Sequence, residues 1–103
     1  MNKRLLMLQK LTSAPEADAF AWYALAMEYR KEDRAEEALS AFATLRMNSP
    51  DYLPMYLMAG QLLIQCDRRD EARSWLEAGI ELAKRQGDTK AVGELQTELA
   101  NTE

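Results

Sequence analysis

The strongest constraint on the fold is an internal repeat with a period of 34 residues. Identical pairs coincide when the sequence is aligned with itself at this offset: Asp33-Arg34 with Asp67-Arg68, Glu37-Ala38 with Glu71-Ala72, and Ser40 with Ser74. Similar residues also coincide: Trp22 with Tyr56, Ala26 with Gly60, Tyr29 with Leu63, and Phe42 with Leu76. Apolar residues recur at helical spacing, and glycine and proline are scarce, so the repeating unit is predicted to be a pair of helices.

The first copy of the repeat shows the pattern most clearly. One helical face carries residues at the spacing i, i+3, i+4, i+7: Trp22, Leu25, Ala26 and Tyr29. After the polar segment 31–34, a second face carries Ala38, Phe42 and Leu45, and Pro50 is expected to end that helix. The small Ala26 and Ala38 are expected where the two helices come closest. We expect Asp33 to be the N-cap of the second helix.

These residues resemble the tetratricopeptide repeat family. The family signature, Trp-x2-Leu-Gly-x2-Tyr, then Ala-x3-Phe, then Pro, is met by Trp22, Leu25, Tyr29, Ala38, Phe42 and Pro50, with Ala26 in place of the glycine. The second copy is looser, with matches at Tyr56, Ala59, Gly60, Leu63, Ala72 and Leu76. Gly79 and Lys84 replace the expected Ala and Pro, so its second helix is expected to continue further. The resemblance implies an all-α, right-handed α-solenoid of antiparallel helix pairs, with about six helices.

The sequence is interpreted as one domain over residues 1–103, with repeats over 19–52 and 53–86. Residues 3–13 are predicted to form an N-terminal cap, the second helix of a degenerate repeat. In this cap Leu5, Leu8 and Leu11 share one face, and Leu8 and Leu11 take the places of Phe42 and Leu45. Residues 88–100 are predicted to form a C-terminal cap helix, preceded by Gly87 as a helix terminator and begun by Asp88 as N-cap. We expect these two caps to complete the stack at both ends.

Composition and charge argue against several classes of function. The formal net charge of −4 is unfavourable for binding nucleic acid or an anionic membrane. The absence of histidine removes the commonest general base and many metal sites. The lone Cys66 and the apolar run 5–8, too short for a signal peptide, favour a cytoplasmic protein. We expect no enzyme activity, no cofactor, no metal and no catalytic residues.

The resemblance implies that the first helix of each repeat lines a concave groove that holds a peptide or helix of another protein. In this sequence the groove positions are Phe20, Tyr23, Met27, Arg30, Lys31, Leu57, Gln61, Ile64 and Gln65, with Tyr52 and Met58 as additions. Tyrosine can act as an anchor and methionine adapts to varied partners, so an interaction adaptor is the leading hypothesis. Tyr23, Met27 and Met58 replace the Lys and Asn of family members that grip a C-terminal carboxylate, and this argues against such a clamp.

Three alternatives stand beside the adaptor hypothesis. The same apolar surface could pair two copies of the chain into a homodimer, or it could be covered by neighbouring helices. Binding of a small molecule is a more remote alternative. Two repeats offer less than the roughly 800 Å² per partner of a stable complex, so a transient, micromolar interaction is expected.

Overall fold

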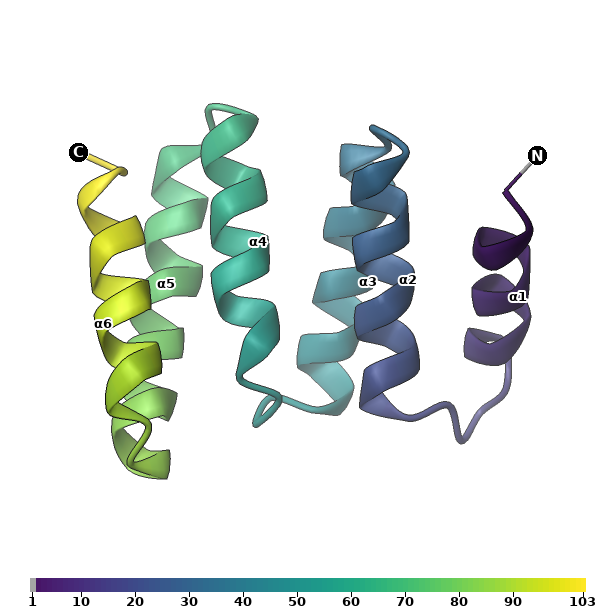
Figure 1. Ribbon diagram of the computed structural model, residues 1–103, viewed down its shortest axis with the longest axis horizontal. Helices are drawn as coiled ribbons and strands as arrows, with labels where there is room; N and C mark the ends of the chain where they lie inside the picture. Colours follow the sequence, from purple (N-terminus) through teal and green to yellow (C-terminus); the bar gives the residue numbers. More distant parts are fainter. Residues whose placement is uncertain (1) are drawn as a thin grey trace. The chain divides into compact units, whose positions relative to one another are not determined.

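The computed structural model describes residues 2–103, and these residues form six α-helices and no β-strand (Figure 1). The helices are α1 (Lys3–Thr12), α2 (Ala19–Lys31), α3 (Ala35–Asn48), α4 (Pro54–Gln65), α5 (Arg69–Gln86) and α6 (Thr89–Ala100). The predicted all-α helical repeat fold is confirmed. The chain divides into two compact units, the first ending at Tyr52 and the second beginning at Leu53. The single domain over 1–103 stays a prediction, and its first residue, Met1, lies outside the described residues.

The N-terminal unit contains α1, α2 and α3. Helices α2 and α3 are antiparallel (Figure 1), and Ala26 and Ala38 are both completely buried, as expected for their closest approach. Phe42 is also fully buried. Trp22 and Tyr29 are only half-buried, because they line a hollow of about 420 Å³ between the three helices. Helix α3 ends at Asn48, two residues before Pro50, in agreement with the predicted stop.

Helix α1 differs from the prediction at one position of its buried face. Leu5 and Leu8 are buried as expected, but Leu11 is 50% exposed and Thr12 is buried instead. The Thr12 hydroxyl donates a hydrogen bond to the carbonyl of Leu8 (2.9 Å), so its burial leaves no unsatisfied polar group. The physical reason is that, in this unit, α1 packs against α2 on one side only. The buried positions follow that single contact at spacings of three and four residues, and Leu11 lies beside them.

The prediction of Asp33 as an N-cap is wrong. Asp33 has a φ of 58°, in the left-handed region, and Arg34 takes the N-cap position of α3 without a side-chain cap bond. The amide of Asp33 donates to the carbonyl of Arg30 (3.1 Å), and the amide of Arg34 donates to that of Tyr29 (2.9 Å). This pair of bonds is a Schellman motif, which ends α2. Aspartate tolerates the left-handed conformation better than most residues, which explains its use here.

The same turn recurs 34 residues later, which explains the repeated Asp-Arg pair in the sequence. Asp67 also has a φ of 58°, and the amide of Arg68 donates to the carbonyl of Leu63 (2.8 Å). In both turns the arginine also pairs with a glutamate in the first turn of the next helix. The Nε–Oε1 distance is 2.7 Å for Arg34 and Glu37, and 2.8 Å for Arg68 and Glu71. The repeated motif therefore both ends one helix and begins the next.

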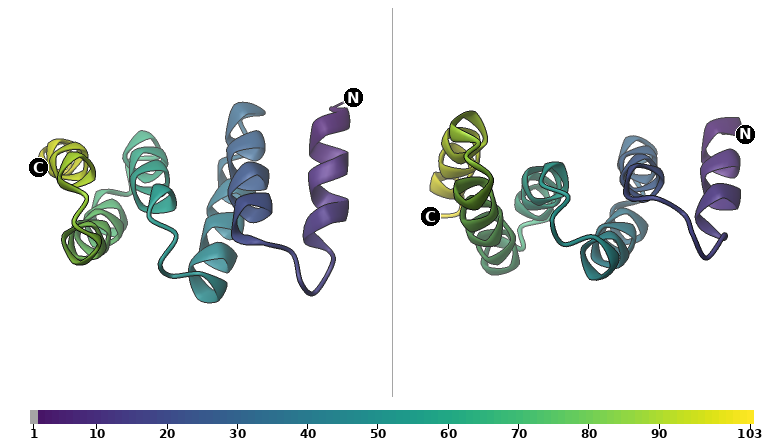
Figure 2. Two further views of the ribbon diagram at one scale, coloured as in Figure 1. Left: turned by 60° about the horizontal axis from the view of Figure 1, so that its bottom comes forward. Right: turned by 90° about the horizontal axis from the view of Figure 1, so that it is seen from below.

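The C-terminal unit contains α4, α5 and α6, with α5 packed against both of the others (Figure 2). Glycines allow close contact along α5: a Cβ built on Gly79 would lie 2.6 Å from the Cβ of Tyr56. Helix α5 extends to Gln86 and has 18 residues against 14 in α3, as the missing proline predicts. Gly87 ends it with a φ of 71°, and the Asp88 side chain caps α6 by accepting from the amide of Ala91 (3.0 Å).

No helix formed by residues 2–103 is both long enough and apolar enough to cross a membrane.

Candidate protein-binding surface

Five of the predicted groove residues lie on α2, in the N-terminal unit, and the first four follow one another at helical spacings of three and four residues. Phe20, in the first turn, is 63% exposed. Tyr23, Met27 and Arg30 are half-buried. The Asp18 side chain caps this helix by accepting from the amide of Ala21 (2.8 Å), and so orders the turn that carries Phe20. The last predicted position on α2, Lys31, is exposed.

Tyr23 is held in an aromatic cluster within the N-terminal unit. Its ring makes an edge contact with Phe42 (6.4 Å between centroids) and a tilted contact with Tyr52 (5.4 Å). Burial raises the pKa of Tyr23, the nearby Tyr52 raises it further, and Arg30 opposes the shift. Tyr23 is therefore a neutral, fixed side chain whose remaining surface is available for contact.

The other predicted groove residues lie on α4, in the C-terminal unit. Leu57, Gln61 and Ile64 are half-buried, and Gln65 is exposed. The amide of Gln61 donates to a carboxylate oxygen of Glu98 in α6 (3.2 Å), so this side chain already has a partner within its unit. Met58 is half-buried as well. Each set of residues is placed within its own unit, and a groove formed by both sets stays a prediction.

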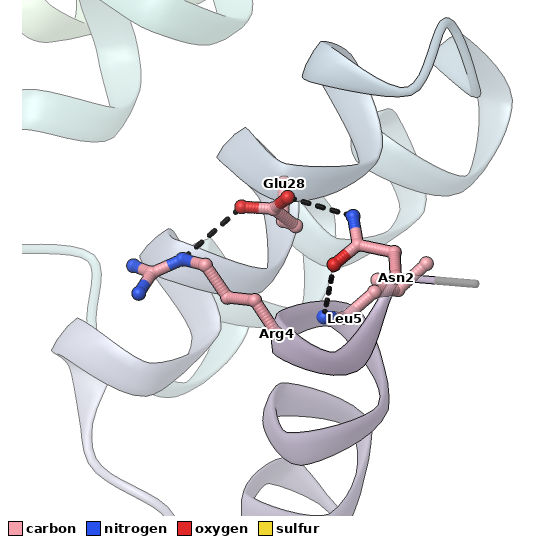
Figure 3. Close-up of polar contacts among 4 residues, drawn as sticks. All are labelled: Asn2, Arg4, Leu5 and Glu28. Carbon is pink, nitrogen blue, oxygen red and sulfur yellow. Dashed lines mark hydrogen bonds and ion pairs between the residues drawn. The ribbon is translucent and has the colours of Figure 1, made fainter.

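Glu28 has a structural role that the sequence pattern did not indicate (Figure 3). Its buried carboxylate accepts hydrogen bonds from Nδ2 of Asn2 (2.8 Å) and from Nε of Arg4 (3.1 Å), which joins α2 to α1. Asn2 also caps α1, because its Oδ1 accepts from the amide of Leu5 (3.0 Å). The hydrogen bond from Asn2 is the main cause that lowers the pKa of Glu28. The partners are 24 and 26 residues away, so no local pattern could reveal them.

An apolar surface on α1 was also missed by the sequence pattern. Leu6, Met7 and Leu11 are exposed, and Met7 and Leu11 line a hollow of about 330 Å³ with Phe20 of α2. Leu6 and Met7 lie outside the stripe that the sequence assigned to α1. The sequence does contain a sign of this surface, because α1 has more apolar residues than one packed face requires.

Among residues 2–103, no group of three or more Cys, Asp and Glu side chains is placed to hold a metal ion. The paired acids at 36–37 and 70–71 lie in the first turns of α3 and α5, where acidic residues favour the helix dipole.

The helix pairs, the 34-residue period and the exposed helical faces together define a helical repeat protein. The tetratricopeptide repeat model matches residues 29–99, and the chain belongs to this family. No curated protein matches the chain.

Several solved structures also share the fold of this chain. The chain is 39% identical to a tetratricopeptide repeat domain protein from Salinibacter ruber, over 82% of this chain and 96% of that one, with a TM-score of 0.77. A protein from Bordetella parapertussis shares the fold at 22% identity, over 99% and 89% of the two chains, with a TM-score of 0.83. PcrH from Pseudomonas aeruginosa shares it at 17% identity, over 95% and 75%, with a TM-score of 0.86. PcrH has also been solved in complex with the chaperone-binding region of PopD.

Proposed function

We propose that this chain is a cytoplasmic, non-enzymatic adaptor that binds a peptide or helix of another protein. In the N-terminal unit the proposed binding residues are Phe20, Tyr23, Met27 and Arg30 on α2. In the C-terminal unit they are Leu57, Gln61 and Ile64 on α4. The proposal rests on one observation: an exposed Phe20 and a Tyr23 fixed by aromatic contacts lie on the same face of α2. Membership of a repeat family supports it, and so does the PcrH–PopD complex, a fold relative bound to part of another protein.

The chemistry of these side chains determines the kind of ligand. Tyr23 is fixed by Phe42 and Tyr52, so it loses little conformational entropy when a partner binds. Met27 adjusts to the shape of an apolar side chain, and Phe20 adds exposed aromatic area. An apolar segment, extended or helical, fits this combination. The surface is small, so dissociation constants in the micromolar range are expected.

The test compares two methionine variants. Affinity capture from the native cell extract and mass spectrometry identify the partner, and its affinity is then measured for each variant by calorimetry. Met27→Glu places a charge on the α2 surface and is expected to weaken binding about tenfold or more. Met47→Glu is the matched control, because Met47 is 85% exposed on α3 and is expected to leave the affinity unchanged.

A second variant of the same surface, Tyr23→Glu, removes the aromatic anchor, and circular dichroism checks that it remains folded. The proposal is wrong if partners bind Met27→Glu and Tyr23→Glu as tightly as the wild type.

Self-association is the second candidate function, and the exposed Phe20 is the observation that favours it. A homodimer through α2 would cover this ring. Light scattering after gel filtration measures the molar mass across a range of protein concentrations. A dimer that Phe20→Glu converts to a monomer would support this candidate, and a monomer at all concentrations would remove it.

A further inference from the structure

The exposed apolar side chains of this protein are concentrated at one place. Among residues 2–103, four of the five large apolar side chains that are exposed lie on α1 or at the start of α2: Leu6, Met7, Leu11 and Phe20. The exception is Met47. Single exposed apolar residues are ordinary on protein surfaces, but a contiguous group indicates an interaction site.

The 34-residue register shows what covers the same positions elsewhere in the chain. Two periods separate α1 from α5, so Met7 corresponds to Trp75, and Leu11 corresponds to Gly79. In the C-terminal unit both of these α5 residues contact Tyr56 of α4. The Trp75 ring lies 5.8 Å from the Tyr56 ring, and Gly79 meets the Tyr56 Cβ. In α5, therefore, a neighbouring helix occupies the side that α1 leaves exposed.

The corresponding place beside α1 is hollow. In the C-terminal unit α5 has α4 and α6 as neighbours, and α4 also contacts α6. Helices α1 and α2 correspond to α5 and α6, and the hollow of about 330 Å³ lies between α1 and the start of α2. Met7, Leu11 and Phe20 line it. Met7 and Leu11 on its wall thus take the positions that α4 covers on α5.

The charge of α1 indicates which charge a partner of its exposed face would carry. Helix α1 carries Lys3, Arg4 and Lys10 and no acidic residue, although the whole chain has a formal charge of −4. Arg4 is paired with Glu28, but Lys3 and Lys10 lie with Leu6 and Met7 around a second hollow of about 650 Å³. Two copies of α1 facing each other would bring these lysines together, which disfavours a symmetric dimer through this face.

We propose that the exposed face of α1 binds an amphipathic helix of another protein, with acidic residues beside its apolar stripe, in the place that α4 takes on α5. By the same register Met27 and Arg30 of α2 correspond to Leu95 and Glu98 of α6, which lie beside Tyr56 and Gln61 of α4, so the bound helix would also contact the α2 surface of the proposed function. Leu11 stands at the position that Gly79 has in α5, and its side chain would fill the space that Tyr56 occupies beside Gly79. The bound helix therefore needs a small residue where α4 has Tyr56. Glutamates flanking the stripe would be attracted by the net positive charge of α1. The basic, apolar face could also suit an anionic membrane, but the chain's net charge opposes that occupant.

The test uses two synthetic helices as probes. Both keep the buried stripe of α4 (Ala59, Gly60 and Leu63), have alanine in place of Tyr56, and are cross-linked because short isolated helices are marginal in water. At the positions of Leu57 and Ile64 one probe carries glutamate and the other carries lysine. Fluorescence anisotropy measures their binding to the full chain and to the Met7→Glu, Leu11→Glu, Met27→Glu and Met47→Glu variants.

The acidic probe is expected to bind the wild type about tenfold more tightly than the basic probe, and more weakly as salt is raised. Met7→Glu and Leu11→Glu are each expected to weaken it about tenfold or more, and Met27→Glu is expected to weaken it as well, whereas Met47→Glu leaves it unchanged. Because Met7 and Leu11 are half exposed, these variants are expected to fold, and circular dichroism checks this.

Several results would overturn the proposal. These are equal binding of the two probes, no binding of the acidic probe, or an acidic probe that is insensitive to Met7→Glu and Leu11→Glu. Binding of the wild type to phosphatidylglycerol vesicles that is lost in Met7→Glu would assign the face to a membrane instead. Loss of acidic-probe binding in Met27→Glu alone would place the site on α2. A negative result with the two probes does not affect the proposed function of the α2 surface. That proposal is tested by the binding of the captured partner to Met27→Glu.

Discussion

Glu28 shows how a single residue can connect two helices. On the surface of α2 it would be an ordinary helix-forming residue, but its carboxylate accepts hydrogen bonds from Asn2 and Arg4. The bond from Asn2 lowers the pKa of Glu28 below its ordinary value of 4.5. The ionised carboxylate is therefore stabilised by folding, which links the stability of the protein to pH.

We predict that the protein loses stability as the pH falls below about 4.5, the ordinary pKa of these carboxyl groups. Hydrogen bonds from Arg34 and Arg68 lower the pKa values of Glu37 and Glu71 in the same direction as that of Glu28. Folded-state pKa values below the unfolded ones mean that this stabilisation is complete above the unfolded values and disappears as the pH falls through the folded ones. Urea unfolding at pH 7, 5, 4 and 3 measures the change.

The Glu28→Gln variant separates the contribution of Glu28. It is expected to be less stable than the wild type at pH 7 and to lose less stability between pH 7 and pH 3. Glu94→Gln, an exposed position on α6, is the matched control and is expected to follow the wild type. A Glu28→Gln profile parallel to that of the wild type would contradict the role assigned to this carboxylate.

At the scale of elements, the contact of α5 with α4 and α6 depends on Gly79. We predict that Gly79→Ala destabilises the protein by about 1–3 kcal/mol, because the new methyl group would overlap Tyr56 and approach Leu95 at 3.1 Å. The Tyr56 Cβ is attached directly to the backbone and cannot move aside as a side-chain end could. Gly93→Ala in α6 is the control: a Cβ there meets nothing within 4 Å, and alanine favours the helix by about 0.5–1 kcal/mol. Thermal unfolding followed by circular dichroism distinguishes the two, and equal shifts would refute the overlap.

The helices could be predicted from the sequence because their apolar spacing is regular and their ends carry strong signals, such as Pro50, Gly87 and Asp88. Asp33 was assigned wrongly, because an aspartate before a helix can serve either as N-cap or as a left-handed terminator of the preceding helix. Only the backbone angle distinguishes the two roles, and Asp67 in the same register shows that the choice is systematic. The exposure of Leu11 depends on which helices surround α1, a tertiary property that its spacing does not contain.

At the scale of the whole molecule, charge argues against one class of partner. The formal charge of −4 repels the phosphate backbone, and the basic residues of α1 are too few to reverse this. We predict no saturable binding to duplex DNA in about 150 mM salt, the physiological ionic strength. Fluorescence anisotropy with a labelled duplex measures this, and a histone-like basic protein serves as the positive control. Tight binding that weakens with salt would contradict the prediction.

The attachment of α1 has a consequence for local unfolding. Within its unit this helix packs mainly on α2, and its inter-helix hydrogen bonds end on Glu28 and Tyr29. Helices buried on several sides open only with the rest of their unit, whereas a helix held on one side can detach alone. The amide protons of α1 should therefore have lower protection factors against exchange than those of α2, and lowering the pH should reduce the protection factors of α1 before those of α2. A helix bound to the exposed face of α1 would raise these protection factors, because α1 would then be held on two sides.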